Sequence, residues 1–170
     1  MIINKLRIYL ETSAFNYYFD DDRNGHEDVI KLFEAIKVGK YEGYTSRYTT
    51  DELMKAPEPK RSNMLSLVEK YGITVLGYTI EASKLASMYI EEKIIPASQR
   101  LDSLHIATAT VYKLNCIISY NFHHINRDKT RFNTAIINEK EGYTKELEHL
   151  IHKSIKKVQD DICNMSYNTA

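Results

Sequence analysis

The order of patterns along this chain predicts an α/β fold, in which helices cover both faces of a mostly parallel sheet. Three observations lead to this fold class. Short apolar runs of strand length alternate with longer stretches whose apolar residues recur at helical spacing. Hydrophobic residues form 43% of the 170 residues, which is enough for a real core. The alternation runs through the chain once, so we expect a single domain.

The first part of the chain opens with a short buried strand. Residues 6–10 are apolar, β-branched or aromatic, and they end abruptly at Glu11. Residues 20–25 form a polar loop rich in turn-forming residues. Within residues 28–38, apolar side chains recur at i, i+3, i+4 and i+7, and Gly39 follows as a stop. The further elements expected here are a strand at 41–45, helices at 49–55 and 61–70, and a strand at 73–76.

The second part of the chain continues this alternation. The elements expected here are helices at 80–93 and 101–114, strands at 116–119 and 135–138, and a charged amphipathic helix at 146–161. Residues 122–134 are polar and basic, and we expect them to be irregular. We therefore divide the chain into a main domain at 1–145 and a charged C-terminal helix and tail at 146–170, packed on the same domain.

The charge and cysteine content narrow the class of protein. The 23 basic residues match the 23 acidic ones, so net charge indicates no nucleic-acid partner, although a local basic patch can still bind phosphate. Cys116 and Cys163 form no disulfide pattern. No apolar run approaches the roughly 20 residues that span a bilayer, and the first residues lack the apolar core of a signal peptide. We therefore expect a cytoplasmic protein.

Four polar residues, far apart in the sequence, are each placed to point at one spot. Glu11 and Asn121 follow two of the predicted strands, whereas Glu52 and Asp102 lie on predicted helices. In an open α/β sheet, ligands bind beyond the carboxyl ends of the parallel strands. A cluster of oxygen ligands suits a hard divalent cation such as Mg²⁺ or Mn²⁺. The set therefore predicts metal-assisted cleavage of phosphodiester bonds.

Each of the four residues also has a purely structural explanation. Glu11 can be an ordinary carboxylate at a helix start, and Glu52 can be a solvated helix residue. Asp102 can cap a helix N-terminus, a role compatible with metal binding. Asn121 can be a turn residue after its strand. The case for a shared site rests on the four residues together.

At these positions the chain resembles the PIN-domain family of ribonucleases, which includes many toxins of toxin–antitoxin pairs. The matching motifs follow the family's order and spacing from about residue 6 to about residue 143. These motifs are Tyr9-Leu10-Glu11-Thr12-Ser13, Thr50-Asp51-Glu52-Leu53, Asp102-Ser103-Leu104-His105-Ile106-Ala107 and Ile118-Ser119-Tyr120-Asn121-Phe122-His123-His124-Ile125.

The resemblance implies a three-layer α/β/α sandwich with about five strands and a Mg²⁺- or Mn²⁺-dependent endoribonuclease activity. It implies that Glu11, Glu52, Asp102 and Asn121 are the catalytic and metal-binding residues. It also implies RNA as substrate, an antitoxin protein as partner, and a homodimer. Two positions depart from the family pattern: Glu11 stands where the family usually has Asp, and Asn121 occupies its fourth acidic position.

Residues around these four are candidates for supporting roles. Ser13, Arg47 and Arg127 are expected to contact substrate, although Ser13 can equally be a turn residue and the two arginines can be solvated. His105 lies one helical turn after Asp102, so it can be either a metal ligand or a packed, hydrogen-bonded histidine. Tyrosine-rich segments can stack on unpaired RNA bases, or simply pack.

Two other functions remain open at this point. A catalytically silent PIN-like domain that binds RNA or protein would account for the departures at Glu11 and Asn121. A phosphatase on a similar sheet is a third possibility, because fold alone does not fix function. The Asp-x-Asp sequence that such a phosphatase would usually need is missing from the first strand.

Overall fold

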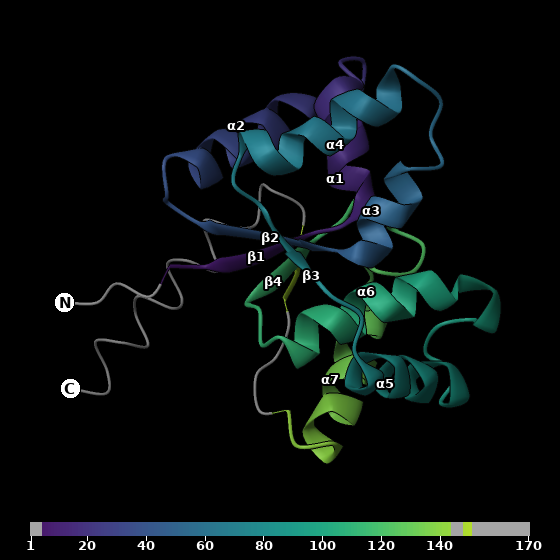
Figure 1. The fold of residues 1–170 in the computed structure, drawn as a ribbon. Coiled ribbons are helices and arrows are strands. Elements are labelled where there is room, and N and C mark those ends of the chain that lie inside the picture. Colours follow the sequence, from purple (N-terminus) through teal and green to yellow (C-terminus); the bar gives the residue numbers. More distant parts are fainter. Residues whose placement is uncertain (1–4, 144–147, 151–170) are drawn as a thin grey trace, which may run out of the picture.

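The computed structural model describes residues 5–143 and 148–150. Its centre is a five-stranded sheet in which every neighbouring pair of strands runs parallel (Figure 1). The strand order is β3-β2-β1-β4-β5. The strands are β1 (Arg7–Leu10), β2 (Glu42–Ser46), β3 (Thr74–Leu76), β4 (Cys116–Ile118) and β5 (Glu148–Leu150). The predicted parallel sheet of about five strands is confirmed.

The strand order reverses between β1 and β4, at the middle of the sheet. From β1 the chain moves outward through β2 to β3, and then returns to β4 on the other side of β1. Ile8 of β1 pairs with Gly43 of β2 and with Cys116 of β4, so these three strands end at the same edge. Such a reversal opens a crevice beyond the carboxyl ends of the strands, where ligands bind in open α/β sheets.

Helices cover both faces of the sheet and make the predicted three layers (Figure 1). One face carries α1 (Thr12–Phe19), α2 (His26–Lys37) and α4 (Lys60–Lys70), and the other carries α5 (Ile80–Glu91), α6 (Arg100–Val111) and α7 (Asp128–Lys140). The short helix α3 (Arg47–Leu53) follows β2 directly and contacts α1, α4 and α6. Across the described part of the chain, no helix has both the length and the apolar character needed to cross a membrane.

Successive residues of β1 belong to two separate cores. Ile8 and Leu10 pack with the helices α1, α2 and α4, whereas Tyr9 packs with α5, α6 and α7. This alternation follows from the period of two along a strand. The central strand β4 is apolar throughout, because both of its faces are buried, which is typical of parallel sheets.

Two of the expected elements are wrong, and the helices α1 and α7 were not expected. Residues 135–138 were predicted as a final strand, but they lie inside α7, which also replaces the second half of the irregular stretch at 122–134. The charged helix predicted at 146–161 is wrong at Glu148–Leu150, which form the parallel edge strand β5; the rest of that range lies outside the described residues. Helix α1 directly follows β1 and was not predicted.

Candidate active site

The structure brings the four predicted residues to the carboxyl edge of the sheet. Glu11 directly follows β1 and is the N-cap of α1, and Asn121 follows β4. Glu52 lies on α3, and Asp102 lies in the first turn of α6. The edge of the sheet at the reversal of strand order therefore carries two side chains that follow strands and two that lie on helices.

Glu11 is almost completely buried, with 7% of its surface exposed, and three donors hold one of its oxygens. Its Oε2 accepts hydrogen bonds from the Ser13 backbone N–H at 3.2 Å, from Ser13 Oγ at 2.5 Å and from Ser119 Oγ at 3.0 Å. The bond from Ser13 N–H is the capping interaction that starts α1. Together these bonds fix the carboxylate in one orientation at the end of β1.

Glu52 is held from two sides. Its Oε2 accepts a hydrogen bond from Thr12 Oγ1, and it lies 3.1 Å from His105 Nε2. Burial raises the pKa of the Glu52 carboxyl, but the hydrogen bond and positive charge of His105, with the bond from Thr12, outweigh burial and lower it. Glu52 is therefore a carboxylate that the surrounding protein keeps ionised.

His105 links this carboxylate to the centre of the sheet. The imidazole is 1% exposed, and its Nδ1 lies 2.7 Å from the hydroxyl of Tyr9, which lies 2.6 Å from Ser46 Oγ. Burial acts to lower the pKa of His105, but Tyr9, the hydrogen bond with Glu52 and the charge of Glu11 raise it. The packed, hydrogen-bonded histidine considered from the sequence is confirmed, and its partner belongs to the site.

Asp102 and Asn121 form a second pair at this edge of the sheet. Asn121 Nδ2 donates to Asp102 Oδ2 at 3.1 Å, and Asn121 Oδ1 accepts from the His124 backbone N–H at 3.0 Å. Burial raises the pKa of the Asp102 carboxyl, and the charge of Glu11 raises it further, while His105 acts in the opposite direction. Asn121 is therefore both a turn residue after β4 and a partner of Asp102.

The donor atoms of the site suit a divalent cation. One ligand atom from each of Glu11, Glu52 and His105 lies within 4.8 Å of the other two. Asp102 stands beside this group, close enough for its charge and that of Glu11 to interact. Carboxylate oxygens are the ligands preferred by Mg²⁺ and Mn²⁺, and this geometry brings two of them together with a third nearby.

Sequence reasoning assigned no role to Ser46 or Ser119, which form hydrogen bonds within the site. Thr12 belongs to the first matching motif, and its hydroxyl donates to Glu52. The spacing of Asp102 and His105 did carry a signal, since residues three apart share a helix face.

The residues expected to contact substrate lie in three different settings. Ser13 holds Glu11 and also accepts a hydrogen bond from the Tyr120 backbone N–H at 2.9 Å. The Arg47 guanidinium lies 5.4 Å from the ring centre of Tyr78, and Arg127 donates to the backbone carbonyl of His123 at 3.3 Å. Contact of these three residues with substrate stays a prediction.

Comparisons with known proteins agree with the fold. The model of the PIN domain matches residues 8–129, which is more than half of the chain. No curated protein matched the sequence. VapBC2 from Rickettsia felis, solved bound to a DNA fragment from its promoter, has 12% identity and a TM-score of 0.51, with 85% of this chain and 98% of that chain covered.

A second solved structure is VapC20 from Mycobacterium tuberculosis, described as a toxin that cleaves the sarcin–ricin loop. It has 12% identity and a TM-score of 0.48, with 67% of this chain and 89% of that chain covered. At 12% identity, the likeness to VapBC2 supports the fold, while the match of the PIN domain model supports the family. The chain therefore belongs to the PIN-domain family.

Proposed function

We propose that this protein is a metal-dependent endoribonuclease that hydrolyses phosphodiester bonds in RNA. The observation that carries the proposal is the convergence of Glu11, Glu52 and Asp102 at the reversal of strand order. Three carboxylates drawn together repel one another, and a bound cation would relieve that repulsion. Membership of the PIN-domain family supports the same chemistry.

Glu11, Glu52 and Asp102 would hold a Mg²⁺ or Mn²⁺ ion in this proposal. When bound, the ion would lower the pKa of a water molecule and polarise the phosphoryl group. The chain itself aims the carboxylates: Ser13 and Ser119 fix Glu11, and His105 with Thr12 fixes Glu52. Hydrogen-bond partners of this kind orient metal ligands and set their affinity.

Asn121 acts from the edge of the site in this proposal. Its amide nitrogen donates to Asp102, while its amide oxygen accepts from the His124 backbone. It therefore orients Asp102 and limits the negative charge of the site. Arg47 and Arg127, both exposed, are proposed to contact the phosphates of the RNA.

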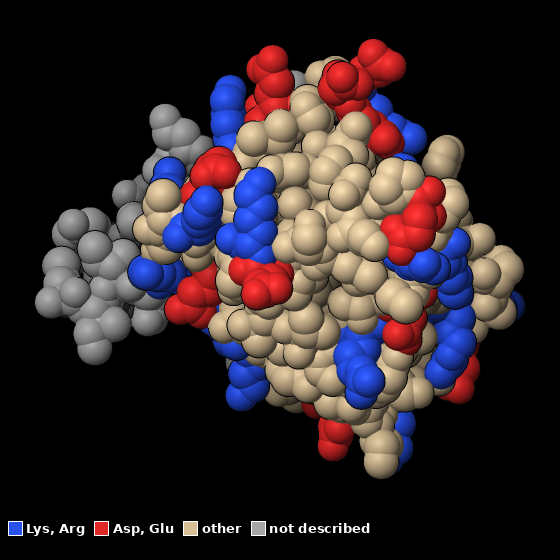
Figure 2. All heavy atoms as spheres, turned by 45° about the horizontal axis from the view of Figure 1, so that its top comes forward, with Lys and Arg blue, Asp and Glu red and all other residues tan. Residues whose placement is uncertain are grey.

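RNA binding in this proposal rests on local contacts, because the chain has no net charge. Figure 2 shows Lys and Arg side chains interspersed with Asp and Glu on the face that it presents, with a broad uncharged area between them. That face therefore has no broad basic surface. Affinity would come from a few phosphate contacts and from contacts with the bases.

We further propose that the nuclease is the toxin of a toxin–antitoxin pair and works as a homodimer. Membership of the PIN-domain family and the fold shared with VapBC2 support this assignment. In the proposed division of the chain, residues 1–145 form the nuclease and residues 146–170 a C-terminal extension. The edge strand β5 of that extension pairs with β4, which supports its packing on the same domain.

One observation favours a second function. Asn121 occupies the fourth acidic position of the family pattern, and both ends of its amide already have protein partners. A catalytically silent PIN domain that binds RNA or protein would keep such an amide without loss of function, because its function would not require a fourth carboxylate. This second function requires the remaining carboxylates to be unable to support cleavage.

Incubation of purified protein with unstructured RNA, in Mn²⁺ or in EDTA, separates the two functions. The nuclease proposal predicts cleavage in Mn²⁺ and none in EDTA. Cleavage that is equal in both conditions would indicate a metal-independent contaminant. Intact RNA across a range of Mn²⁺ concentrations would favour the silent domain.

A further inference from the structure

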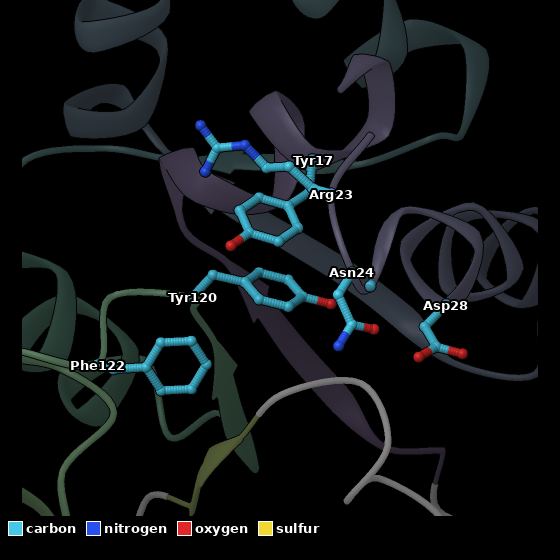
Figure 3. A pocket seen from close by; sticks show the side chains of 7 residues that line it. Tyr17, Arg23, Asn24, Asp28, Tyr120 and Phe122 are labelled. Atoms are coloured by element: carbon cyan, nitrogen blue, oxygen red, sulfur yellow. The ribbon is translucent and has the colours of Figure 1, made fainter. Parts of the chain in front are cut away.

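A hollow of about 440 Å³ opens beside the candidate active site, between the loop after α1 and the loop after β4 (Figure 3). We call it the aromatic hollow. Three aromatic rings line it together with polar side chains from the loop after α1 and the start of α2. Its lining includes Tyr17, Tyr120, Phe122, Arg23 and Asp28.

The aromatic rings are arranged as a platform. Tyr17 and Tyr120 are stacked, with ring centres 3.8 Å apart and planes 15° apart. Phe122 lies on the side of Tyr120 away from Tyr17, with its ring centre 6.4 Å from that of Tyr120 and its plane nearly perpendicular (Figure 3). The Phe122 side chain is 54% exposed. Tyr17 therefore covers one face of the Tyr120 ring, while Phe122 exposes apolar surface to solvent.

A glycine lets the loop approach this platform closely. Gly25 has a φ of +115°, and a Cβ placed there would lie 3.0 Å from a ring carbon of Tyr120. A larger residue would therefore strain the backbone and press on the ring. This close approach brings the loop of residues 20–25 against Tyr120 and forms one wall of the hollow.

The platform is tied directly to the catalytic carboxylates. The Tyr120 backbone N–H donates to Ser13 Oγ, and Ser13 Oγ donates to Glu11. Tyr120 also lies between Ser119 and Asn121 in the sequence, and both of these residues have hydrogen bonds within the site. A ligand on the platform would therefore sit next to a phosphodiester bond held at Glu11.

The charges around the hollow favour a base over a phosphate. Arg23 is paired with Asp20 at 3.0 Å, and its guanidinium lies 4.9 Å from the ring centre of Tyr17. Asp28 lines the same hollow as Tyr120 and brings a carboxylate to it. A phosphate would meet this carboxylate, whereas a flat neutral ring gains from aromatic stacking.

We propose that the aromatic hollow is a subsite that binds an unpaired base of single-stranded RNA, adjacent to the bond held at the carboxylates. This subsite rests on the proposed endoribonuclease function for its substrate. Sequence-specific recognition of RNA commonly relies on unstacked bases placed on aromatic side chains. The base would cover Phe122 and the outer edge of Tyr120.

The test measures binding of a fluorescein-labelled single-stranded RNA by anisotropy in EDTA, so that cleavage cannot interfere. Phe122→Ala should weaken binding about tenfold, the size expected for loss of one base–aromatic stack. The matched control is Phe132→Ala, because Phe132 on α7 is similarly exposed, at 66%, and lies outside the hollow. This variant should bind within about twofold of wild type.

An abasic oligonucleotide of the same length is the second probe. It should compete at least about tenfold less well than the matching RNA, because it offers phosphates without rings. Equal competition would overturn base recognition. Equal binding by wild type and Phe122→Ala, or equal loss in Phe122→Ala and Phe132→Ala, would also overturn the subsite.

A parallel cleavage assay in Mn²⁺ separates this proposal from the nuclease proposal. Cleavage by wild type with no effect of Phe122→Ala on RNA binding would overturn the subsite alone. If the protein binds RNA through Phe122 but never cleaves RNA, the nuclease proposal would be wrong and the subsite proposal would still hold. If both hold, Phe122→Ala should raise KM with little change in kcat, because binding energy common to the ground state and the transition state is lost.

Discussion

The two sides of the candidate active site hold their carboxylates in different ways. On one side, Glu52 is fixed by Thr12 and by the buried imidazole of His105, and its pKa is lowered. On the other side, Asp102 has the amide of Asn121 as its partner, and burial and Glu11 raise its pKa. Glu11 stands between them and is held by two serines.

This difference indicates that the two carboxylates would contribute differently to binding a cation. The Glu52 carboxylate is held in place without metal, because Thr12 and His105 already form hydrogen bonds with it. The Asp102 side is electrostatically strained without metal, because a partly buried carboxylate there faces a second carboxylate. Metal binding should therefore relieve the repulsion at Asp102 more than at the other carboxylates. Loss of the Asp102 charge should have the largest effect on function.

Asp102→Asn should lower metal-dependent RNA cleavage by more than about 100-fold, since the effect of a direct ligand should exceed that of an outer-shell partner. The same change should raise the thermal stability of the metal-free protein, because the repulsion with Glu11 is relieved. Cleavage rates and melting curves measure both effects. Asp128→Asn is the matched control, because Asp128 is an exposed acidic residue in the first turn of α7.

His105→Leu should destabilise the protein by about 1–3 kcal/mol, since Glu52 loses a buried hydrogen-bond partner. Cleavage should fall by about 10–100-fold, as expected when a partner that orients a metal ligand is removed. His105→Gln should recover part of the activity, because its amide can still donate to Glu52. Urea denaturation and cleavage rates test this pair. Equal activity of wild type and His105→Leu would make His105 a packing residue only.

The two carboxylates should give opposite stability profiles with pH. The lowered pKa of Glu52 adds stability above the ordinary carboxyl range, and this stability is lost as pH falls through the folded pKa. The raised pKa of Asp102 is a destabilisation that is present above the folded pKa and disappears below the ordinary value of 3.8.

At neutral pH without metal, Glu52→Gln should therefore be less stable than wild type and Asp102→Asn more stable. Both differences should vanish in acid. Thermal denaturation in EDTA at a series of pH values provides the measurement. The same sign of change for both variants at neutral pH would contradict the comparison between the two sides.

The smallest effect is expected at Asn121. Asn121→Ala should reduce cleavage by less than about tenfold, since a neutral partner contributes less than a charged ligand. Asn121→Asp should tighten Mn²⁺ binding by adding a fourth carboxylate. A Mn²⁺ titration in which the aspartate variant binds more weakly than the alanine variant would show that Asn121 serves the turn after β4 rather than the metal.

The sequence predicted the elements around the site more reliably than those at the C-terminal end, and α7 shows why. The buried side chains of α7 are Thr130, Thr134, Ile137 and Asn138. Their spacing is helical, but three of the four are polar, so hydrophobic periodicity does not register them. Thr134 donates to the Thr130 carbonyl within α7, and Asn138 accepts from the Tyr89 hydroxyl of α5, so hydrogen bonds satisfy this polar face.

The edge strand β5 was missed for a different reason. Its three residues pair with β4, with Cys116 opposite Glu148, and a partner so distant in the sequence leaves no local pattern. The carboxylates were identified because strand ends and helix starts are local features. The hydrogen bond that joins Tyr9 to His105 was not identified from the sequence, because it connects a strand residue with a helix residue 96 positions away.

Isothermal titration of the metal-free protein with Mn²⁺ tests the central claim most directly, because it requires no RNA substrate. Wild type should bind Mn²⁺, Glu11→Asp should retain binding because it keeps the charge, and Glu11→Gln should bind at least about tenfold more weakly. Glu27→Gln, at an exposed glutamate on α2, is the control and should match wild type. Absence of Mn²⁺ binding by wild type, or equal binding by Glu11→Gln, would contradict a metal site built from these carboxylates.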